Sequence, residues 1–223
     1  MIAFVAIPLT LLSMQQGAGS PVAQRLAGRV SPQIAALVEE LGTGASARGL
    51  PIDPLIQKAI EGSAKGIAPE RIATALRLVA MQLDTAAAAL RDGGTQLASD
   101  TLAIAAGEFA ITAGLSGSDI TALARTGADA AALTVGLRVA GTLAALGVPP
   151  PEDIGLVSVA LRSGEPASSL LLLPATVQSE IGRGATPAQA AAGLARAAAA
   201  QARHGPPPGR GGGNPHPPHP PHP

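Results

Sequence analysis

The chain has 223 residues, enough for one core of ordinary size or two small ones. Its fifteen basic and fifteen acidic residues cancel, so no long-range field would steer it towards nucleic acid or an anionic membrane. The absence of cysteine excludes disulfides, thiol catalysis and thiolate metal sites. Phe4 and Phe109 are the only aromatic residues, so Ala, Leu, Ile and Val must build the core.

The beginning of the chain is predicted to be a signal peptide, residues 1–24. An apolar run over residues 1–12 is followed by small and polar residues, in the order of a leader and its cleavage region. No Lys or Arg precedes Arg25, so the positive start of a leader is missing. The alternative is a hydrophobic N-terminal helix docked on the core. We expect export to the periplasm or the extracellular space, with a cut between Ala18 and Gln24.

The clearest helical pattern lies in residues 53–83. Asp53 is the expected N-cap of a first helix, with Pro54 at its first position. Gly66 can end that helix in the left-handed conformation, and Pro69 starts a second one. The second helix has one apolar stripe of period near 3.6, formed by Ile72, Leu76, Val79, Ala80 and Leu83. This stretch predicts an αα-hairpin whose apolar faces pack against other elements.

The same start and stop signals predict helices along the rest of residues 25–204, which we expect to form one all-α domain. The hairpin's second helix is open to extension as far as Asp92, and residues 43–50 are expected to form a loop or a weak turn of helix after a stop at Gly42. No stretch alternates as a strand does. The further helices are expected over residues 31–41, 96–113, 118–126, 129–146, 152–163, 174–181 and 186–203.

The helix starts recur along the chain. Asp53, Asp119 and Asp153 lie 66 and 34 residues apart, and Thr186 follows Asp153 by 33. A unit of 33–34 residues therefore fits, with one degenerate copy in residues 84–100. Helical hairpins of this length stack into a short α-solenoid; chance spacing in an Ala-rich chain and an irregular bundle are the alternatives. The tetratricopeptide repeat has this length, but its Trp, Tyr and Phe positions have no counterpart here.

Residues 205–223 form a Pro/His/Gly-rich tail that we expect to be disordered. His216, His219 and His222 are spaced by three, so polyproline II geometry would place them on one edge, about 9 Å apart. That distance is too large for two of them to share an ion in a straight chain. They are candidate ligands for weak binding of Zn, Ni or Cu, and the alternative is a solvated low-complexity tail.

The part of the chain before the tail contains few residues that could catalyse a reaction or bind a cofactor. All four histidines lie in or beside the tail, and no nucleophile–base motif, zinc motif or phosphate-binding loop occurs. The adjacent pairs Glu39-Glu40 and Glu152-Asp153 diverge on a helix, so we expect them to serve as solvated faces and first-turn charges. We therefore predict that the protein is not an enzyme and uses no cofactor.

Two very apolar stretches, residues 102–115 and 130–146, each carry one central charge, Glu108 and Arg138. The first is too short to cross a bilayer, and a central charge costs the second about 3 kcal/mol, so we expect no membrane span in the mature chain. An unpaired buried charge is costly, which predicts that Glu108 and Arg138 either meet or reach solvent.

For Glu108 and Arg138 to meet, the two helices that carry them must pack closely. Small residues beside the charges, Gly107, Gly136 and Gly141, would allow that approach.

These observations predict an exported, non-catalytic α-helical protein that acts as a scaffold or binds another protein, in a groove between helices or on the concave side of a solenoid. A scarcity of aromatics and scattered arginines argue against nucleic acid as the partner. One alternative is a metal-handling or cell-envelope-associated protein that works through the His-Pro tail. Another is a carrier with an apolar cavity between its helices.

Overall fold

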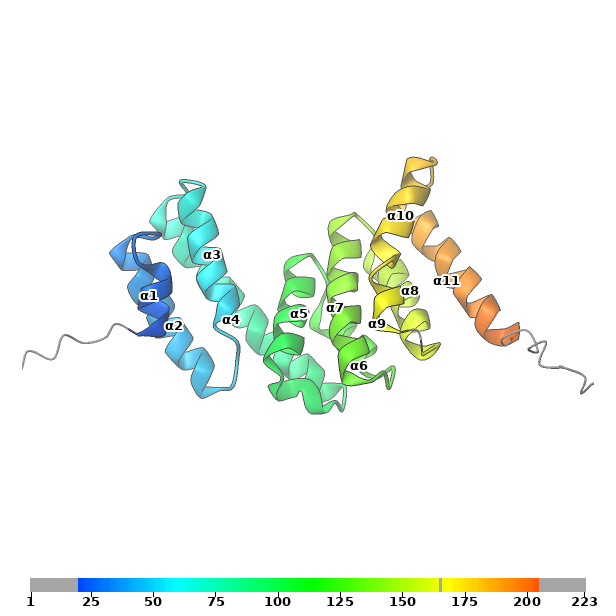
Figure 1. Ribbon diagram of the computed structural model, residues 1–223, viewed down its shortest axis with the longest axis horizontal. Coiled ribbons are helices and arrows are strands. Elements are labelled where there is room, and N and C mark those ends of the chain that lie inside the picture. The colour runs from blue at the N-terminus through cyan, green and yellow to red at the C-terminus, as the bar shows by residue number, and fades with distance from the viewer. Residues whose placement is uncertain (1–19, 165, 205–223) are drawn as a thin grey trace, which may run out of the picture.

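Figure 1 shows the computed structural model, in which helices follow one another along the long axis of the molecule. The structure describes residues 20–164 and 166–204, and within them every regular element is helical. The all-α prediction is thus confirmed for this part of the chain. The elements are α1 (Pro21–Leu26), α2 (Pro32–Ala47), α3 (Asp53–Ala64), α4 (Pro69–Asp92), the short 3-10 helix η1 (Gln96–Ser99), α5 (Thr101–Thr112), α6 (Gly117–Ala124), α7 (Ala130–Ala145), α8 (Pro150–Arg162), α9 (Ala167–Leu170), α10 (Leu173–Gly182) and α11 (Pro187–His204).

The predicted hairpin is present as α3 and α4, and α4 does continue to Asp92. Gly66 links them with a φ of 66°, a conformation that glycine adopts without steric cost. One detail of the prediction is wrong, because Asp53 is the first residue of α3 and Ile52 is its N-cap. The Asp53 carboxylate instead forms an ion pair with Arg25, which ties α1 to the start of α3.

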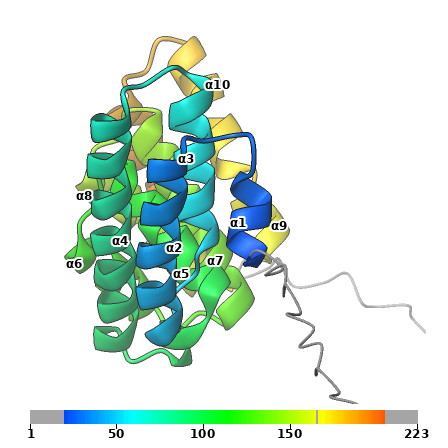
Figure 2. The same cartoon turned by 90° about the vertical axis from the view of Figure 1, so that its left-hand side faces the viewer.

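The helices form two rows. In one row α4 packs against α6, α6 against α8 and α8 against α11, and Figure 2 shows α4, α6 and α8 on one side of the molecule. In the other row α5 packs against α7, which also contacts α9 and α10. The core between the rows consists of Leu, Ile, Val and Ala side chains, as the composition requires.

The long helix α4 organises the N-terminal half. It packs against α2, α3, α5 and α6. However, α3 and α5 make little direct contact with each other, although both lie on α4. This arrangement leaves the space between α3 and α5 open.

Four helix pairs follow one another along the chain, α3 with α4, α5 with α6, α7 with α8, and α10 with α11, and a recurrent turn precedes the second helix of each. The turn glycines have positive φ, and each stands three residues before the first residue of α4, α6, α8 or α11. They are Gly66, Gly114, Gly147 and Gly184, which lie 48, 33 and 37 residues apart.

The residues from which the repeat was predicted do not occupy equivalent positions, because some lie in the first helix of a pair and others in the second. Asp53 begins α3, the first helix of its pair, whereas Asp119 and Asp153 lie in the first turns of the second helices α6 and α8. Thr186 directly precedes α11, another second helix, and its backbone N–H bonds Gln189 Oε1 as predicted for a capping box. The predicted spacing of 66 residues therefore joins positions that are not equivalent.

Two predicted boundaries are wrong. The helix predicted to stop at Gly42 runs on to Ala47, in keeping with the helical alternative for the residues that follow. Gly42 is a point of close contact inside this helix, since a Cβ there would lie 3.0 Å from Ile52 Cγ2. The stretch 96–113 is divided into η1 and α5, and Asp100 caps α5 by accepting hydrogen bonds from the backbone N–H groups of Leu102 and Ala103.

Within the described residues, α4 is the one helix whose length and apolar content would suffice to cross a membrane. One side of α4 nevertheless packs in the core of the protein, where Leu76, Leu83 and Leu90 are fully buried. The two apolar stretches considered above lie in α5 and α7, helices of 12 and 16 residues.

Candidate functional site

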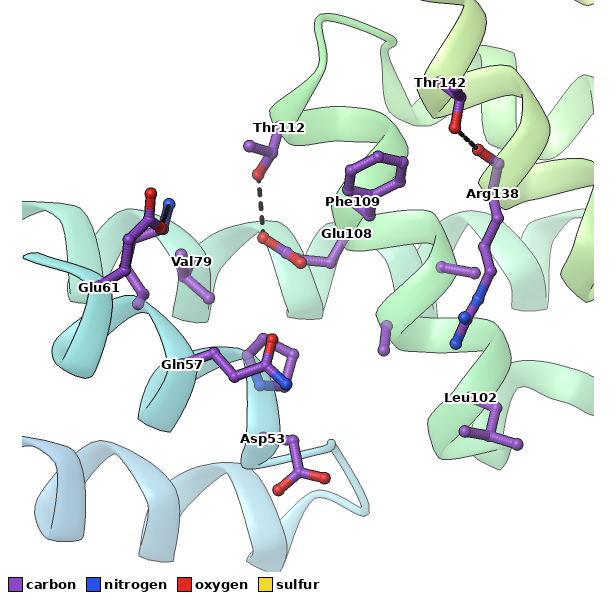
Figure 3. A pocket seen from close by; sticks show the side chains of 14 residues that line it. Asp53, Gln57, Glu61, Val79, Leu102, Glu108, Phe109, Thr112, Arg138 and Thr142 are labelled. Atoms are coloured by element: carbon purple, nitrogen blue, oxygen red, sulfur yellow. Dashed lines mark hydrogen bonds and ion pairs between the residues drawn. The ribbon is translucent and has the colours of Figure 1, made fainter. Parts of the chain in front are cut away.

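A hollow of about 590 Å³ opens between α3 and α5, where the two helices stand apart on α4. We refer to it as the α3–α5 groove. Figure 3 shows its side chains: α3 contributes Gln57 and Glu61, α4 contributes Val79, and α5 contributes Leu102, Glu108 and Phe109. Lys58 of α3 also lines the groove. Arg138 and Thr142 of α7 border it beyond α5. Apolar and charged groups therefore share one concave surface.

Glu108 is the least exposed charged side chain of the groove, at 8% exposure. Its Oε1 accepts a hydrogen bond of 2.9 Å from the Thr112 hydroxyl, one turn further along α5. Thr112 Oγ1 also lies 3.0 Å from Oε1 of Gln82 on α4. Burial raises the pKa of Glu108, and the Thr112 hydrogen bond and the positive charge of Lys58 oppose that rise without cancelling it.

The predicted ion pair between Glu108 and Arg138 is not present. Arg138 is exposed, and its side chain runs toward Leu102 on the opposite side of α5 from Glu108 (Figure 3). The guanidinium makes no ion pair with any described residue. The alternative outcome, in which Arg138 reaches solvent, is the observed one, because its long stem carries the charge clear of the apolar helix face.

The three glycines that were expected to bring α5 and α7 together serve three different contacts. Gly141 of α7 does lie against α5, since a Cβ there would be 2.6 Å from Cδ1 of Phe109. Gly107 instead faces Ala86 of α4, and Gly136 faces Leu161 of α8.

The other charges of the groove are already paired. Asp53 is bound by Arg25, and Glu61 is bound by Lys58 at 3.2 Å and by Lys65. Hydrogen bonds from Lys65 first and Lys58 second hold the pKa of the exposed Glu61 below its usual value. Glu108 and Arg138 thus remain the two groove charges without an ion pair among the described residues.

Two large apolar side chains beside these charges face solvent. Leu102 is 63% exposed and Phe109 is 42% exposed, although both belong to α5, a helix that is otherwise largely buried. An exposed apolar patch next to unpaired charges is typical of a surface that binds another molecule.

Asp153 is a second unusual acid, outside the groove. It is 0% exposed, and neither carboxylate oxygen has a hydrogen-bond partner among the described residues. Burial raises the pKa of Asp153 to about 8, and the charge of Asp119 on α6 adds to the rise. The backbone N–H of Ala144 opposes it, but no hydrogen bond of normal geometry joins this group to the carboxyl.

Asp153 does lie in the first turn of α8 as predicted, but it is buried there and not solvated. The recurrent glycine turn is the signal that would have located it. Asp153 is six residues after Gly147, and the residues six after the other turn glycines are buried and apolar: Ile72, Ile120 and Ala190.

The predicted metal ligands His216, His219 and His222 lie outside the described residues, as does most of the predicted signal peptide. Where the structure does describe the chain, no three His, Asp or Glu side chains gather as a metal site would require. No family model matches the chain, and no curated protein or solved structure matches it either. Function must therefore be argued from the groove itself.

Proposed function

We propose that this protein is an exported, non-catalytic helical scaffold that binds another protein in the α3–α5 groove. The observation that carries the proposal is the exposure of Leu102 and Phe109 on a concave surface between separated helices. Amphipathic or extended segments of partner proteins bind in such grooves by covering apolar side chains. The pattern of residues 1–24 supports export.

The recurrent glycine turn supports a short α-solenoid as the architecture of this scaffold. Four helix pairs share the turn, and the second helices of successive pairs pack in a row from α4 through α6 and α8 to α11. In a solenoid the inner row of helices forms an extended binding surface. The α3–α5 groove is bordered by the first helices of successive pairs, α3, α5 and α7, which would supply such a surface if they form the inner row.

The composition of the groove supports a binding role over catalysis. Its acids are Asp53, Glu61 and Glu108, of which the first two are engaged in exposed ion pairs. No histidine lines it, and Thr112, the hydroxyl beside Glu108, is already hydrogen-bonded to this carboxyl. Among the described residues, no second acid or base is hydrogen-bonded to Glu108 with which it could share a proton transfer.

Site-specific photo-cross-linking in the native host tests the proposal. A photoreactive amino acid replaces Leu102 in the groove or, as a matched control, Met81 on α4, which is equally exposed at 64% but does not line the groove. We expect a discrete protein adduct from position 102 and none from position 81. Identical adduct patterns from the two positions, or no adduct from position 102, would overturn the proposal.

A further inference from the structure

The α3–α5 groove has a charge pattern that specifies its occupant. Asp53 and Glu61 are neutralised by partners of this chain, so they offer little to a ligand. Glu108 has only a neutral hydroxyl as its hydrogen-bond partner, at 2.9 Å. One carboxyl on the wall of the groove thus lacks a cation, and a ligand can supply one.

The surroundings of Glu108 define what must accompany that cation. Leu102 and Phe109 lie on the same helix and are exposed at its surface, and Val79 of α4 lies at the base of the hollow. A free ion would leave these apolar side chains in contact with water. A basic side chain carried between apolar residues would cover them while it reaches the carboxyl, and burying apolar area is favourable.

We infer that the partner bound in the α3–α5 groove is a protein segment in which a lysine or arginine stands between apolar residues, and that this basic side chain forms an ion pair with Glu108. The inference rests on the proposed function and names the chemistry of the partner. Lys58 does not prevent the approach of a cation, because Glu61 holds it at 3.2 Å.

Arg138 gives the segment a direction. Its side chain is exposed and runs toward Leu102, on the far side of α5 from Glu108 (Figure 3). A second basic residue in the segment would be repelled there, whereas an acidic residue would be attracted. The preferred segment therefore has its basic residue over Glu108 and a neutral or acidic residue towards α7.

Selection from a library of random twelve-residue peptides, displayed on phage and applied to the full chain, provides the probe. We expect the selected peptides to carry Lys or Arg flanked by apolar residues. Their dissociation constants are then measured by fluorescence anisotropy on four proteins: the unaltered chain, Glu108→Gln, Leu102→Ser and the control Met81→Ser.

Glu108→Gln keeps an acceptor for Thr112 and removes the charge, so we expect it to weaken binding by about tenfold or more. Replacing the basic residue of the peptide by Gln should weaken binding to the unaltered chain by a similar factor and should have little further effect on the Glu108→Gln variant. Because the form of Glu108 that binds the basic residue is the ionised one, peptide binding should also strengthen from pH 5 to pH 8 in the unaltered chain and in Met81→Ser, and this pH dependence should be lost in Glu108→Gln. Circular dichroism melting checks that each variant is folded.

The outcomes separate this inference from the proposed function. Peptides that need Leu102 but tolerate Glu108→Gln would overturn the inferred chemistry and leave the groove as the binding surface. Peptides that bind all four proteins equally, or a library that yields no binder, would overturn both. A dimer in sedimentation that Leu102→Ser abolishes would identify a second copy of this chain as the occupant instead.

Discussion

At the scale of single residues, Asp153 makes folding depend on pH. Its pKa in the folded chain is about 8, whereas an unfolded aspartate titrates near 3.9. Between these values the folded chain holds a proton that the unfolded chain has released. We therefore expect the free energy of unfolding to be highest below about pH 4 and to fall up to about pH 8, by at most about 1.4 kcal/mol per pH unit from this group. Urea unfolding between pH 5 and pH 9 measures this slope.

Substitution of Asp153 separates its contribution from that of other acids. Asp153→Leu is expected to raise the free energy of unfolding at pH 8 by at least about 1 kcal/mol, because an orphaned polar group is removed from a position that Ile120 fills in the preceding pair. It should also flatten the pH dependence. Glu152→Gln, one residue away and partly exposed, is the control. A Leu variant that keeps the original slope would contradict the assignment.

Single residues also show how far the sequence predicts a site. Glu108 and Arg138 can be identified as unusual from the sequence, since each is a lone charge on an apolar helix. Their separation could not be predicted, because it depends on the rotation of α5 about its own axis. That rotation turns Glu108 towards α3, whereas Arg138 of α7 lies on the opposite side of α5. The groove itself depends on α3 and α5 standing apart, which no local pattern encodes.

At the scale of elements, close contacts between helices depend on particular glycines. Gly141 brings α7 against α5: a Cβ there would meet the Phe109 ring at 2.6 Å and the Cα of Ala110 at 3.0 Å. Gly155 also lies inside a helix, α8, but a Cβ there would meet nothing within 4 Å. The same substitution should therefore have opposite effects at the two positions.

Gly141→Ala is expected to lower the free energy of unfolding by about 1–3 kcal/mol, because the added methyl overpacks the contact between α5 and α7. Gly155→Ala is expected to raise it by about 0.5–1 kcal/mol, because alanine favours the helix and has room. Chemical denaturation of both variants at one pH gives the comparison. Equal changes of the same sign would show that the close approach at Gly141 is not a constraint.

Helix starts were predictable where the signal is local. Ser31 accepts from the backbone N–H of Ile34 at the start of α2, and Thr186 with Gln189 forms the predicted capping box. The end of α2 could not be predicted, because a glycine can either end a helix or allow a neighbouring segment to pack closely against it. The sequence alone does not distinguish these two roles. Gly42 belongs to the second kind, and only the position of Ile52 reveals it.

At the scale of the whole molecule, the first helix restricts where an exported chain can be cut. The hydroxyl of Ser20 caps α1 and donates a 2.7 Å hydrogen bond to Glu39 of α2, and Leu26 at the end of α1 is buried in the core. Within the predicted interval from Ala18 to Gln24, cleavage should therefore leave Ser20 in the mature protein. Mass spectrometry of the exported chain measures this end. A mature N-terminus after Pro21 would show that α1 is dispensable.

The length of α4 sets the distance between α3 and α5, and so the width of the partner that the α3–α5 groove can accept. Because α3 and α5 are attached to one continuous helix of 24 residues and barely touch each other, that helix acts as a spacer between two walls. A helix rises about 1.5 Å per residue and returns to nearly the same orientation after seven residues. Lengthening α4 by two turns would thus move the walls apart by about 10 Å with their facing side chains preserved, whereas a single inserted residue would turn one wall about 100° away from the other.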